Sequence, residues 1–188
     1  MTLDSKRTAL VVIDLQEGIV ALDGAPHGTK DVVARAALLA DAFRSQGAFV
    51  VLVNVGSKDG GDLLKPLTDQ TIPPRPRSAD FMRLVPELKL VASDHLITKH
   101  QWGALYGTDL DLQLRRRKID TIVLCGISTN IGVETTAREA YQAGYEQIFV
   151  EDAMTALSAE EHNHSLRYIF PRLGRVRSTS EVISAIQA

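Results

Sequence analysis

Residues 124–140, LCGISTNIGVETTAREA, predict the passage from a buried strand into a helix. The strand begins upstream, because residues 121–125, TIVLC, are apolar and rich in β-branched side chains, as in strands that are buried on both faces. We expect Gly126 to end this strand. Apolar and small side chains then recur at helical spacing from Ile131 onward, and Gly144 is suited to the end of the helix.

The start of this helix lacks the usual side-chain cap. No Glu or Gln lies three residues after Ser128 or Thr129, so neither residue can form a capping box. The first backbone N–H groups of a helix have no partner within the helix itself. We therefore expect the N–H groups around Ser128 and Gly132 to be available to bind an oxyanion or a carboxylate.

Strands and helices alternate on both sides of this stretch. Apolar runs predict further strands at residues 8–13, 48–55, 95–98, 147–150 and 175–177. Periodic apolar side chains predict helices at residues 31–46, 106–117, 158–170 and 181–187. Ser158 and Glu161 have the spacing of a capping box, which fixes the start of one of these helices. This alternation is typical of an α/β fold, a three-layer α/β/α sandwich over a mostly parallel sheet.

A long segment between residues 56 and 93 interrupts the alternation. Five prolines and a pair of glycines exclude a long regular element there. A loop of more than about 15 residues in a compact domain is usually functional or disordered, and we interpret this one as a lid or a subunit-contact segment. Its Arg75, Arg77 and Arg83 could pair with a substrate carboxylate, although a solvated surface is the more frequent setting for any one arginine.

The composition favours a globular protein that binds a small molecule. The length of 188 residues suits a single domain over residues 1–188. A net charge of −2 and a pI near 6.2 give no electrostatic reason to expect nucleic acid or a membrane surface as a partner. No apolar run reaches the roughly 20 residues of a membrane helix. One cysteine cannot form an internal disulfide and no leader precedes the first strand, so we expect a cytoplasmic protein.

Three distant positions are predicted to converge at one edge of the sheet. Asp14 and Lys99 each follow an apolar strand, and the turn after Gly126 follows another. Ligands of open parallel sheets bind beyond the carboxyl ends of the strands, where all three lie. Asp14 alone is equally well a helix N-cap, and Lys99 alone could extend from the strand end into water. As a pair, however, they would compensate each other's charge.

Three motifs occur in an order that resembles a known family. VVIDLQ at residues 11–16, TKHQWGALYGTDL at 98–110 and CGISTNIGVETTARE at 125–139 are similar to motifs of the isochorismatase-like hydrolases. The resemblance covers nearly the whole chain. It implies a doubly wound sheet of six strands in the order 3-2-1-4-5-6. It also implies dimers or tetramers, so we expect a homo-oligomer.

The resemblance implies a particular branch of the family. Most members carry a nucleophilic cysteine in the first turn of the helix, where this chain has Gly132. Cys125, the only cysteine, lies on the preceding strand and does not correspond to that nucleophile. The chain is therefore similar to the branch that lacks the cysteine and attacks with water. The resemblance also implies a cis peptide between Ile127 and Ser128.

The resemblance assigns roles to residues of these motifs. Asp14 would be the general acid or base, and Lys99 would hold its carboxyl group and stabilise developing negative charge. Gly132 would leave room for substrate or water, although close packing of helix against sheet explains a glycine there equally well. Neighbouring Lys99 lowers the pKa of Asp14 whereas burial raises it, so the sequence leaves its protonation state open. The candidate substrate-binding residues are Gln16, Trp102, Ile127, Ser128 and Asn130, with Tyr106 close to Trp102.

These features predict a cofactor-independent hydrolase of a small anionic or cyclic molecule. The five histidines show no metal-ligand spacing, so we expect no metal. Cleavage of an isochorismate-type vinyl ether and hydrolysis of an amide by water both fit. The rival interpretation is a family member without catalytic activity that binds a small ligand or serves in assembly. Ordinary roles also exist for the binding candidates, because aromatic residues near strand ends are more often core and amides often bond to helix ends.

Overall fold

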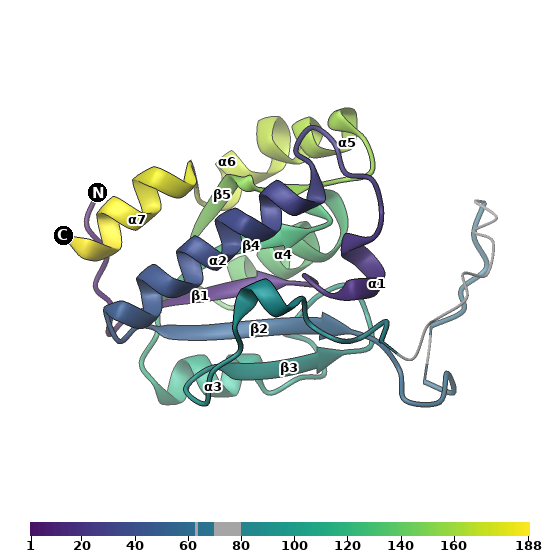
Figure 1. Ribbon diagram of the computed structural model, residues 1–188, viewed down its shortest axis with the longest axis horizontal. Helices are drawn as coiled ribbons and strands as arrows, with labels where there is room; N and C mark the ends of the chain where they lie inside the picture. The colour runs from purple at the N-terminus through teal and green to yellow at the C-terminus, as the bar shows by residue number, and fades with distance from the viewer. Residues whose placement is uncertain (63, 70–79) are drawn as a thin grey trace.

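A parallel sheet forms the centre of the computed structural model, which describes residues 1–62, 64–69 and 80–188 (Figure 1). Its six strands follow the order β3-β2-β1-β4-β5-β6, and every neighbouring pair is parallel. The doubly wound order predicted from the family resemblance is therefore confirmed. The strands are β1 (Thr8–Ile13), β2 (Phe49–Val55), β3 (His95–Lys99), β4 (Thr121–Ile127), β5 (Glu146–Thr155) and β6 (Arg175–Arg177).

Helices cover both faces of the sheet, which confirms the three-layer α/β/α sandwich (Figure 1). One core forms between the sheet and α2 (Thr29–Ser45) with α7 (Thr179–Gln187). The other core forms against α3 (Leu110–Arg116), α4 (Glu134–Gln142) and α6 (Phe170–Leu173). All six residues of β1 are buried because both faces of this central strand are covered. The remaining helical segments are α1 (Glu17–Val20), α5 (Ala159–His164), a 3-10 turn at Pro86–Leu88, and π-helical turns at Thr129–Val133 and Ser165–Ile169.

Two strand ends differ from the prediction. β4 does not end at Gly126 but continues to Ile127. A Cβ atom at position 126 would lie 2.0 Å from the carbonyl oxygen of Ile13, so this glycine permits close approach of β1 and β4 and is not a strand end. β5 runs on to Thr155 beyond the predicted end at Val150, after a shift of register opposite β4.

The helix starts are set by local capping. Ser158 and Glu161 form the predicted capping box at the start of α5, and the helix continues through a π-helical turn into α6. An equivalent box between Ser178 and Glu181 begins α7 earlier than predicted. The helix expected from residue 106 begins only at Leu110, because Gly107 adopts a positive φ and interrupts the helical path.

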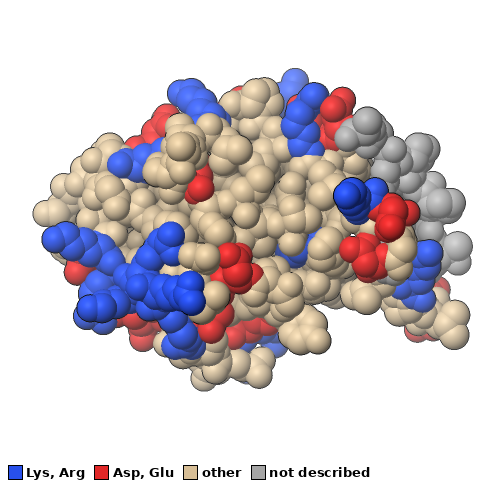
Figure 2. Space-filling view, turned by 90° about the horizontal axis from the view of Figure 1, so that it is seen from below, with Lys and Arg blue, Asp and Glu red and all other residues tan. Residues whose placement is uncertain are grey.

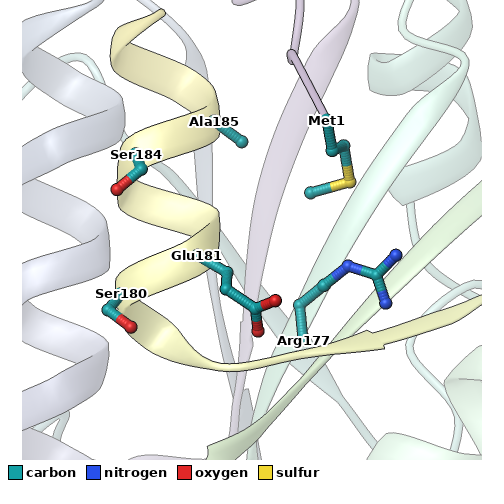
Figure 3. Close-up of a pocket in the computed structure, with 6 residues that line it drawn as sticks. All are labelled: Met1, Arg177, Ser180, Glu181, Ser184 and Ala185. Carbon is teal, nitrogen blue, oxygen red and sulfur yellow. The ribbon is translucent and has the colours of Figure 1, made fainter.

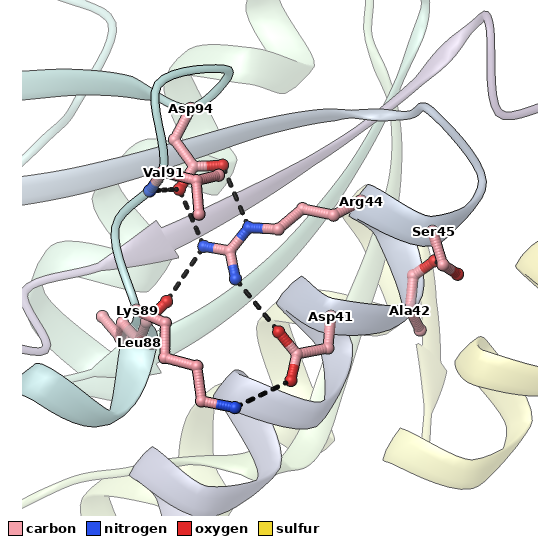
Figure 4. Close-up of polar contacts among 8 residues, drawn as sticks. All are labelled: Asp41, Ala42, Arg44, Ser45, Leu88, Lys89, Val91 and Asp94. Carbon is pink, nitrogen blue, oxygen red and sulfur yellow. Dashed lines mark hydrogen bonds and ion pairs between the residues drawn. The ribbon is translucent and has the colours of Figure 1, made fainter.

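The last part of the long segment between residues 56 and 93 is anchored to α2 by Arg44 (Figure 4). The guanidinium of Arg44 donates hydrogen bonds to both carboxylate oxygens of Asp94, at 3.1 and 2.7 Å, and to the carbonyl oxygen of Leu88. It also pairs with Asp41, which Lys89 contacts from the other side. The Asp94 side chain is 1% exposed, so this charged network fixes the segment against the helix.

Basic side chains gather on one surface around the end of α3 (Figure 2). Residues 115–118 are all exposed, and Arg115 pairs with Asp111 one turn earlier in the helix. Among the described residues, no helix combines the length and apolar character that crossing a bilayer requires.

Candidate active site

Two oppositely charged side chains meet beyond the carboxyl ends of β1 and β3. Asp14 follows β1, and Lys99 is the last residue of β3. Nζ of Lys99 donates a hydrogen bond to Oδ2 of Asp14 over 2.8 Å, and the side chains of Lys99 and Asp14 are 1% and 6% exposed. Because β2 lies between β1 and β3, the pair spans a neighbouring strand. The structure thus brings together the two residues that the sequence predicts to meet.

The backbone turns sharply at Asp14. Its φ of +55° lies in the left-handed region, which Asp enters more readily than most residues. Its N–H donates to the carbonyl oxygen of Val53, and its own carbonyl accepts from the N–H of Gln16. The bond to Val53 holds the Asp14 backbone to β2, and the bond from Gln16 closes the turn, so the position of the carboxyl group is fixed.

Burial controls the protonation of Asp14. Loss of hydration raises the pKa of Asp14 from 3.8 to about 6, outweighing the charge of Lys99 and its hydrogen bond, which both lower that pKa. Of the two opposing effects on the pKa of Asp14 that the sequence predicts, burial is therefore larger than the effect of Lys99. The second oxygen, Oδ1, is buried and has no hydrogen-bond partner among the described residues. An ionised carboxylate with one free oxygen is able to accept a proton at neutral pH.

A pocket of about 360 Å³ opens at this pair. Its volume lies in the range of small-molecule sites. A larger cavity of about 870 Å³ adjoins it, and both are lined by Gln101 and Trp102. The residues that line the smaller pocket are Asp14, Ile19, Leu22, Val55, Lys99, Gln101, Trp102, Ile127, Ser128, Ile131, Gly132 and Leu157.

A third cavity, of about 530 Å³, lies between α7, the N-terminal residues and β6, apart from the Asp14–Lys99 pair (Figure 3). Glu181 points into this region but accepts the hydrogen bonds of the α7 capping box. Arg177 donates to the carbonyl oxygen of Val176. These polar groups are already used by the fold, so the pocket at Asp14 is the better candidate site. Among the described residues, no three His, Cys, Asp or Glu side chains are grouped as metal ligands.

The turn after β4 forms one wall of the pocket. The peptide bond between Ile127 and Ser128 is cis, as the family resemblance implies. A π-helical turn follows over Thr129–Val133, and no side chain caps its start. Behind the turn, Oγ1 of Thr129 lies 2.9 Å from Nδ1 of the buried His162. The turn is thus held from the protein interior while Ser128 faces the pocket.

Gly132 lies directly beside the Asp14 carboxyl group. A Cβ atom at this position would lie 3.2 Å from Oδ2 of Asp14 and 3.0 Å from Cγ2 of Ile13. The second distance reflects close packing of the π-helical turn Thr129–Val133 against β1, and the first shows that any side chain here would point at the carboxyl group. Both explanations of this glycine therefore apply together.

Two of the predicted binding residues do not line the pocket. Gln16 is fully buried, and its amide donates to the carbonyl oxygens of Val55 and Phe81 and accepts from the N–H of Val55. It joins the end of β2 to the segment that returns at residue 81. Oδ1 of Asn130 is buried without a partner among the described residues, and its side chain is absent from the pocket lining. Their predicted substrate contacts remain untested.

Trp102 lines the pocket from an exposed loop that α4 holds in place. Its side chain is 63% exposed. Oε2 of Glu139 accepts from the N–H groups of Leu105 and Tyr106, and Oγ1 of Thr136 accepts from the N–H of Ala104. Sequence reasoning missed both supporting residues on α4, although their helical spacing of three placed them on one face.

The apolar walls of the pocket were also missed. Three segments supply apolar lining residues that were not predicted to bind a ligand. They are Ile19, Leu22, Ile131 and Leu157, and only Ile131 lies within a motif. Tyr106 is 76% exposed and does not line the pocket. The described arginine of the long segment, Arg83, pairs with Glu17 and Asp80, whereas Arg75 and Arg77 lie outside the described residues.

Residues 8–181 match the isochorismatase domain. The chain belongs to the isochorismatase family. It is 52% identical to the isochorismatase family protein YwoC of Bacillus subtilis, over 100% of this chain and 98% of that protein. An isochorismatase family protein of Burkholderia thailandensis is 45% identical over 100% of this chain and 98% of the other, with a TM-score of 0.95.

The chain is also similar to a cysteine hydrolase. The cysteine hydrolase of Pseudomonas syringae pv. phaseolicola is 28% identical over 100% of this chain and 95% of its own, with a TM-score of 0.84. In the present chain, the thiol of Cys125 is fully buried in the core beneath α2 and α7. Burial raises the pKa of Cys125 to about 12. This thiol does not line the pocket at Asp14.

Proposed function

We propose that this member of the isochorismatase family hydrolyses a small molecule by direct attack of water, without a covalent cysteine intermediate. The observation that carries the proposal is the Asp14 carboxyl group, which lines the pocket, is bound through Oδ2 to Lys99, and has at its buried Oδ1 no partner among the described residues. Gly132 supports it, because the residue beside that carboxyl group has no side chain to act as a nucleophile.

The proposed reaction begins with a water molecule hydrogen-bonded to the carboxylate of Asp14. The carboxylate takes one proton as the oxygen of water bonds to the electrophilic carbon of the substrate. Negative charge that develops on the substrate is stabilised by Lys99 and by backbone N–H groups of the turn that begins at Ser128. The bond to the leaving group then breaks, and the leaving group takes the proton from Asp14. The carboxylate is thereby restored, and no external oxidant or cofactor enters the balance.

The pKa of Asp14 suits both halves of this cycle. With a pKa of about 6, the carboxyl group is mostly ionised at pH 7 to 8 and can accept a proton. A carboxylate with this pKa takes a proton from water more readily than an ordinary carboxylate, and the protonated form still releases the proton near neutral pH, where acid–base catalysis works best. We expect activity to rise as the pH increases through about 6.

Turnover assays test the proposal. Wild type, Asp14→Asn and Lys99→Ala would be assayed against isochorismate and a panel of primary amides, with Asp23→Asn as a control carboxyl group on an exposed residue. We expect Asp14→Asn to lower kcat by about 10²- to 10⁴-fold and Asp23→Asn to leave it unchanged. An unchanged rate in Asp14→Asn contradicts the mechanism.

A second candidate function is binding of a small ligand without catalysis. It is favoured by the absence of a nucleophilic side chain at Gly132. Failure of every substrate to turn over, together with saturable binding in the pocket, would support this alternative. Retention of the paired Asp14 and Lys99, whose burial is costly, favours the hydrolase.

A further inference from the structure

Two acceptors fix the ammonium group of Lys99. Besides its bond to Oδ2 of Asp14 at 2.8 Å, Nζ donates a hydrogen bond to the carbonyl oxygen of Gln101 over 3.2 Å. A lysine ammonium carries three N–H donors, and the third has no partner among the described residues. Because the ammonium is tetrahedral, two fixed bonds also set the direction of this third donor. The position of the Gln101 carbonyl group therefore decides how the ammonium is oriented in the pocket.

The Gln101 carbonyl group belongs to a loop that its own side chain closes. Nε2 of Gln101 donates hydrogen bonds to the carbonyl oxygens of Gly103 and Tyr106, at 3.0 and 2.6 Å. The two ends of residues 101–106 are thereby joined. A displacement of Tyr106 would consequently also move Gln101, whose carbonyl oxygen binds Lys99.

Glu139, on α4, holds the far end of this loop. Its Oε2 accepts hydrogen bonds from the N–H groups of Leu105 and Tyr106, at 2.9 and 3.3 Å. Hydrogen bonds to an ionised group are roughly twice as strong as those between neutral groups. Gly103 leaves room for the carboxylate, since a Cβ atom there would lie 2.2 Å from Oε1 of Glu139. The glycine of the loop and the acid of the helix are thus matched to each other.

Thr136, on the same face of α4 as Glu139, ties the loop to the turn after β4. Its Oγ1 accepts from the N–H of Ala104 over 3.1 Å and donates to the carbonyl oxygen of Gly132 over 2.7 Å. The Thr136 side chain is fully buried, so these bonds are shielded from water. The loop that contacts Lys99 and the turn that contains Gly132 are therefore held by one helix.

We propose that Glu139 is a positioning residue of the active site, which holds the loop of residues 101–106 so that the Gln101 carbonyl group orients the Lys99 ammonium. Glu139 acts through the loop and does not touch the reacting atoms. Donors that stabilise a developing charge are most effective when they are fixed before the reaction. The proposal rests on the proposed function for the chemical role of Lys99, but the hold on Lys99 can be measured without any substrate.

Acetylation by N-hydroxysuccinimidyl acetate, followed by peptide mass spectrometry, measures how firmly Lys99 is held. Its side chain is 1% exposed, whereas that of Lys89 is 70% exposed and serves as the internal reference. We expect Glu139→Ala to speed the acetylation of Lys99 relative to Lys89 by at least about tenfold, because a loosened loop opens locally more often. Glu139→Gln keeps an acceptor oxygen and should return the relative rate to within about threefold of the wild type.

Two further variants separate this role from a general effect on stability. Gly103→Ala displaces the Glu139 carboxylate and should speed acetylation of Lys99 as Glu139→Ala does; because the φ of Gly103 is not positive, the methyl group acts through this contact. Ser178→Ala removes the capping box of α7, outside the loop and the pocket, and should leave the relative rate unchanged. An unchanged rate in folded Glu139→Ala contradicts the proposal, as does equal acceleration in Ser178→Ala. If Glu139→Ala does not fold, Gly103→Ala decides.

Kinetic measurements keep this proposal apart from the proposed function. With any substrate that the wild type hydrolyses, Glu139→Ala should lower kcat at least about tenfold, change KM less than about threefold, and have no further effect in Lys99→Ala. Additive losses in the double variant would refute an action through Lys99. Faster acetylation of Lys99 in Glu139→Ala, without hydrolysis of any substrate by the wild type, would refute the hydrolase and leave the role of Glu139 intact. Hydrolysis that requires Asp14 but is unaffected by Glu139→Ala would support the hydrolase and refute that role.

Discussion

Replacing Lys99 by methionine tests the coupling on which the candidate site depends. The substitution nearly conserves side-chain length but removes the ammonium group that donates to Oδ2 of Asp14. Both influences that lower the pKa of Asp14, the charge of Lys99 and its hydrogen bond, disappear, while burial remains. We therefore expect the pKa of Asp14 to rise above its present value of about 6.

The expected loss of stability follows from this pKa. In the wild type, the rise from 3.8 to about 6 means that ionised Asp14 opposes folding by about 3 kcal/mol above pH 6. The folded state holds the proton of Asp14 more tightly than the unfolded state. The loss of folding stability therefore develops as the pH rises from 3.8 to about 6 and then stops. In Lys99→Met the loss should continue above pH 6, at about 1.4 kcal/mol per pH unit, until the new pKa is reached. The difference from wild type would thus grow between pH 6 and pH 8, by at most about 3 kcal/mol.

Urea denaturation followed by circular dichroism at pH 6, 7 and 8 measures this difference. The control is the double variant Asp14→Asn/Lys99→Met, which removes the titrating group and should not show the additional pH dependence. A pH-independent effect of Lys99→Met would refute the reasoning. So would an equal pH dependence in the single and double variants, because another group would then be responsible.

Three further predictions concern groups outside the charged pair. Burial, and secondarily His27, lowers the pKa of His162 to about 4. Neutral His162 therefore supports the folded state fully above pH 6.5, and up to about 3 kcal/mol of stability should be lost as the pH falls to 4. In urea denaturation across this range, the free energy of unfolding of His162→Gln should depend less on pH than that of the wild type. Arg44→Leu leaves the buried Asp94 carboxylate without its cation and should cost about 3–5 kcal/mol in the same assay, against less than about 1 kcal/mol for Arg115→Leu in an exposed pair. Cys125 should react with iodoacetamide at pH 8 only as fast as the protein unfolds, and rapid labelling of the native protein, detected by mass spectrometry, would contradict its burial.

Elements with two buried faces could be predicted closely from the sequence. β1 occupies the predicted residues Thr8–Ile13, because a continuous apolar run has few alternatives in a domain of this size. The order of the strands, by contrast, cannot be read from apolar runs, since each run is compatible with any position inside the sheet. That order was predicted only from the family resemblance, and the structure confirms it.

Strand ends could not be predicted where distant residues decide them. Gly126 was predicted to end β4, but it lies close to Ile13 and pairs with it within the sheet. Asp152 likewise reads as the end of β5, but its carboxylate accepts hydrogen bonds from the N–H and Oγ1 of Thr179 at the start of α7. The hydrogen-bond partner of the Asp152 carboxylate lies more than 25 residues away, so the residues around Asp152 in the sequence do not predict it.

The candidate site divides in the same way. Asp14 and Lys99 were found because a charged residue at the end of an apolar strand is unusual. Gln16 has similar surroundings in the sequence, but its amide is fully used by backbone groups of Val55 and Phe81. The apolar walls gave no signal, because an isolated leucine such as Leu22 has the same appearance in a core and in a pocket.

The burial of the Asp14–Lys99 pair has no explanation in stability alone. Apolar side chains of similar volume at two such positions are often equally or more stabilising than a buried ion pair. The dehydration that makes the pair costly is, however, the same effect that raises the pKa of Asp14 to about 6, within reach of neutral pH. Moving the pair into solvent would restore stability and at the same time return the carboxyl group to an ordinary, weak base. The cost in folding energy and the proposed ability to activate water therefore have one physical origin, and a variant cannot lose the first while keeping the second.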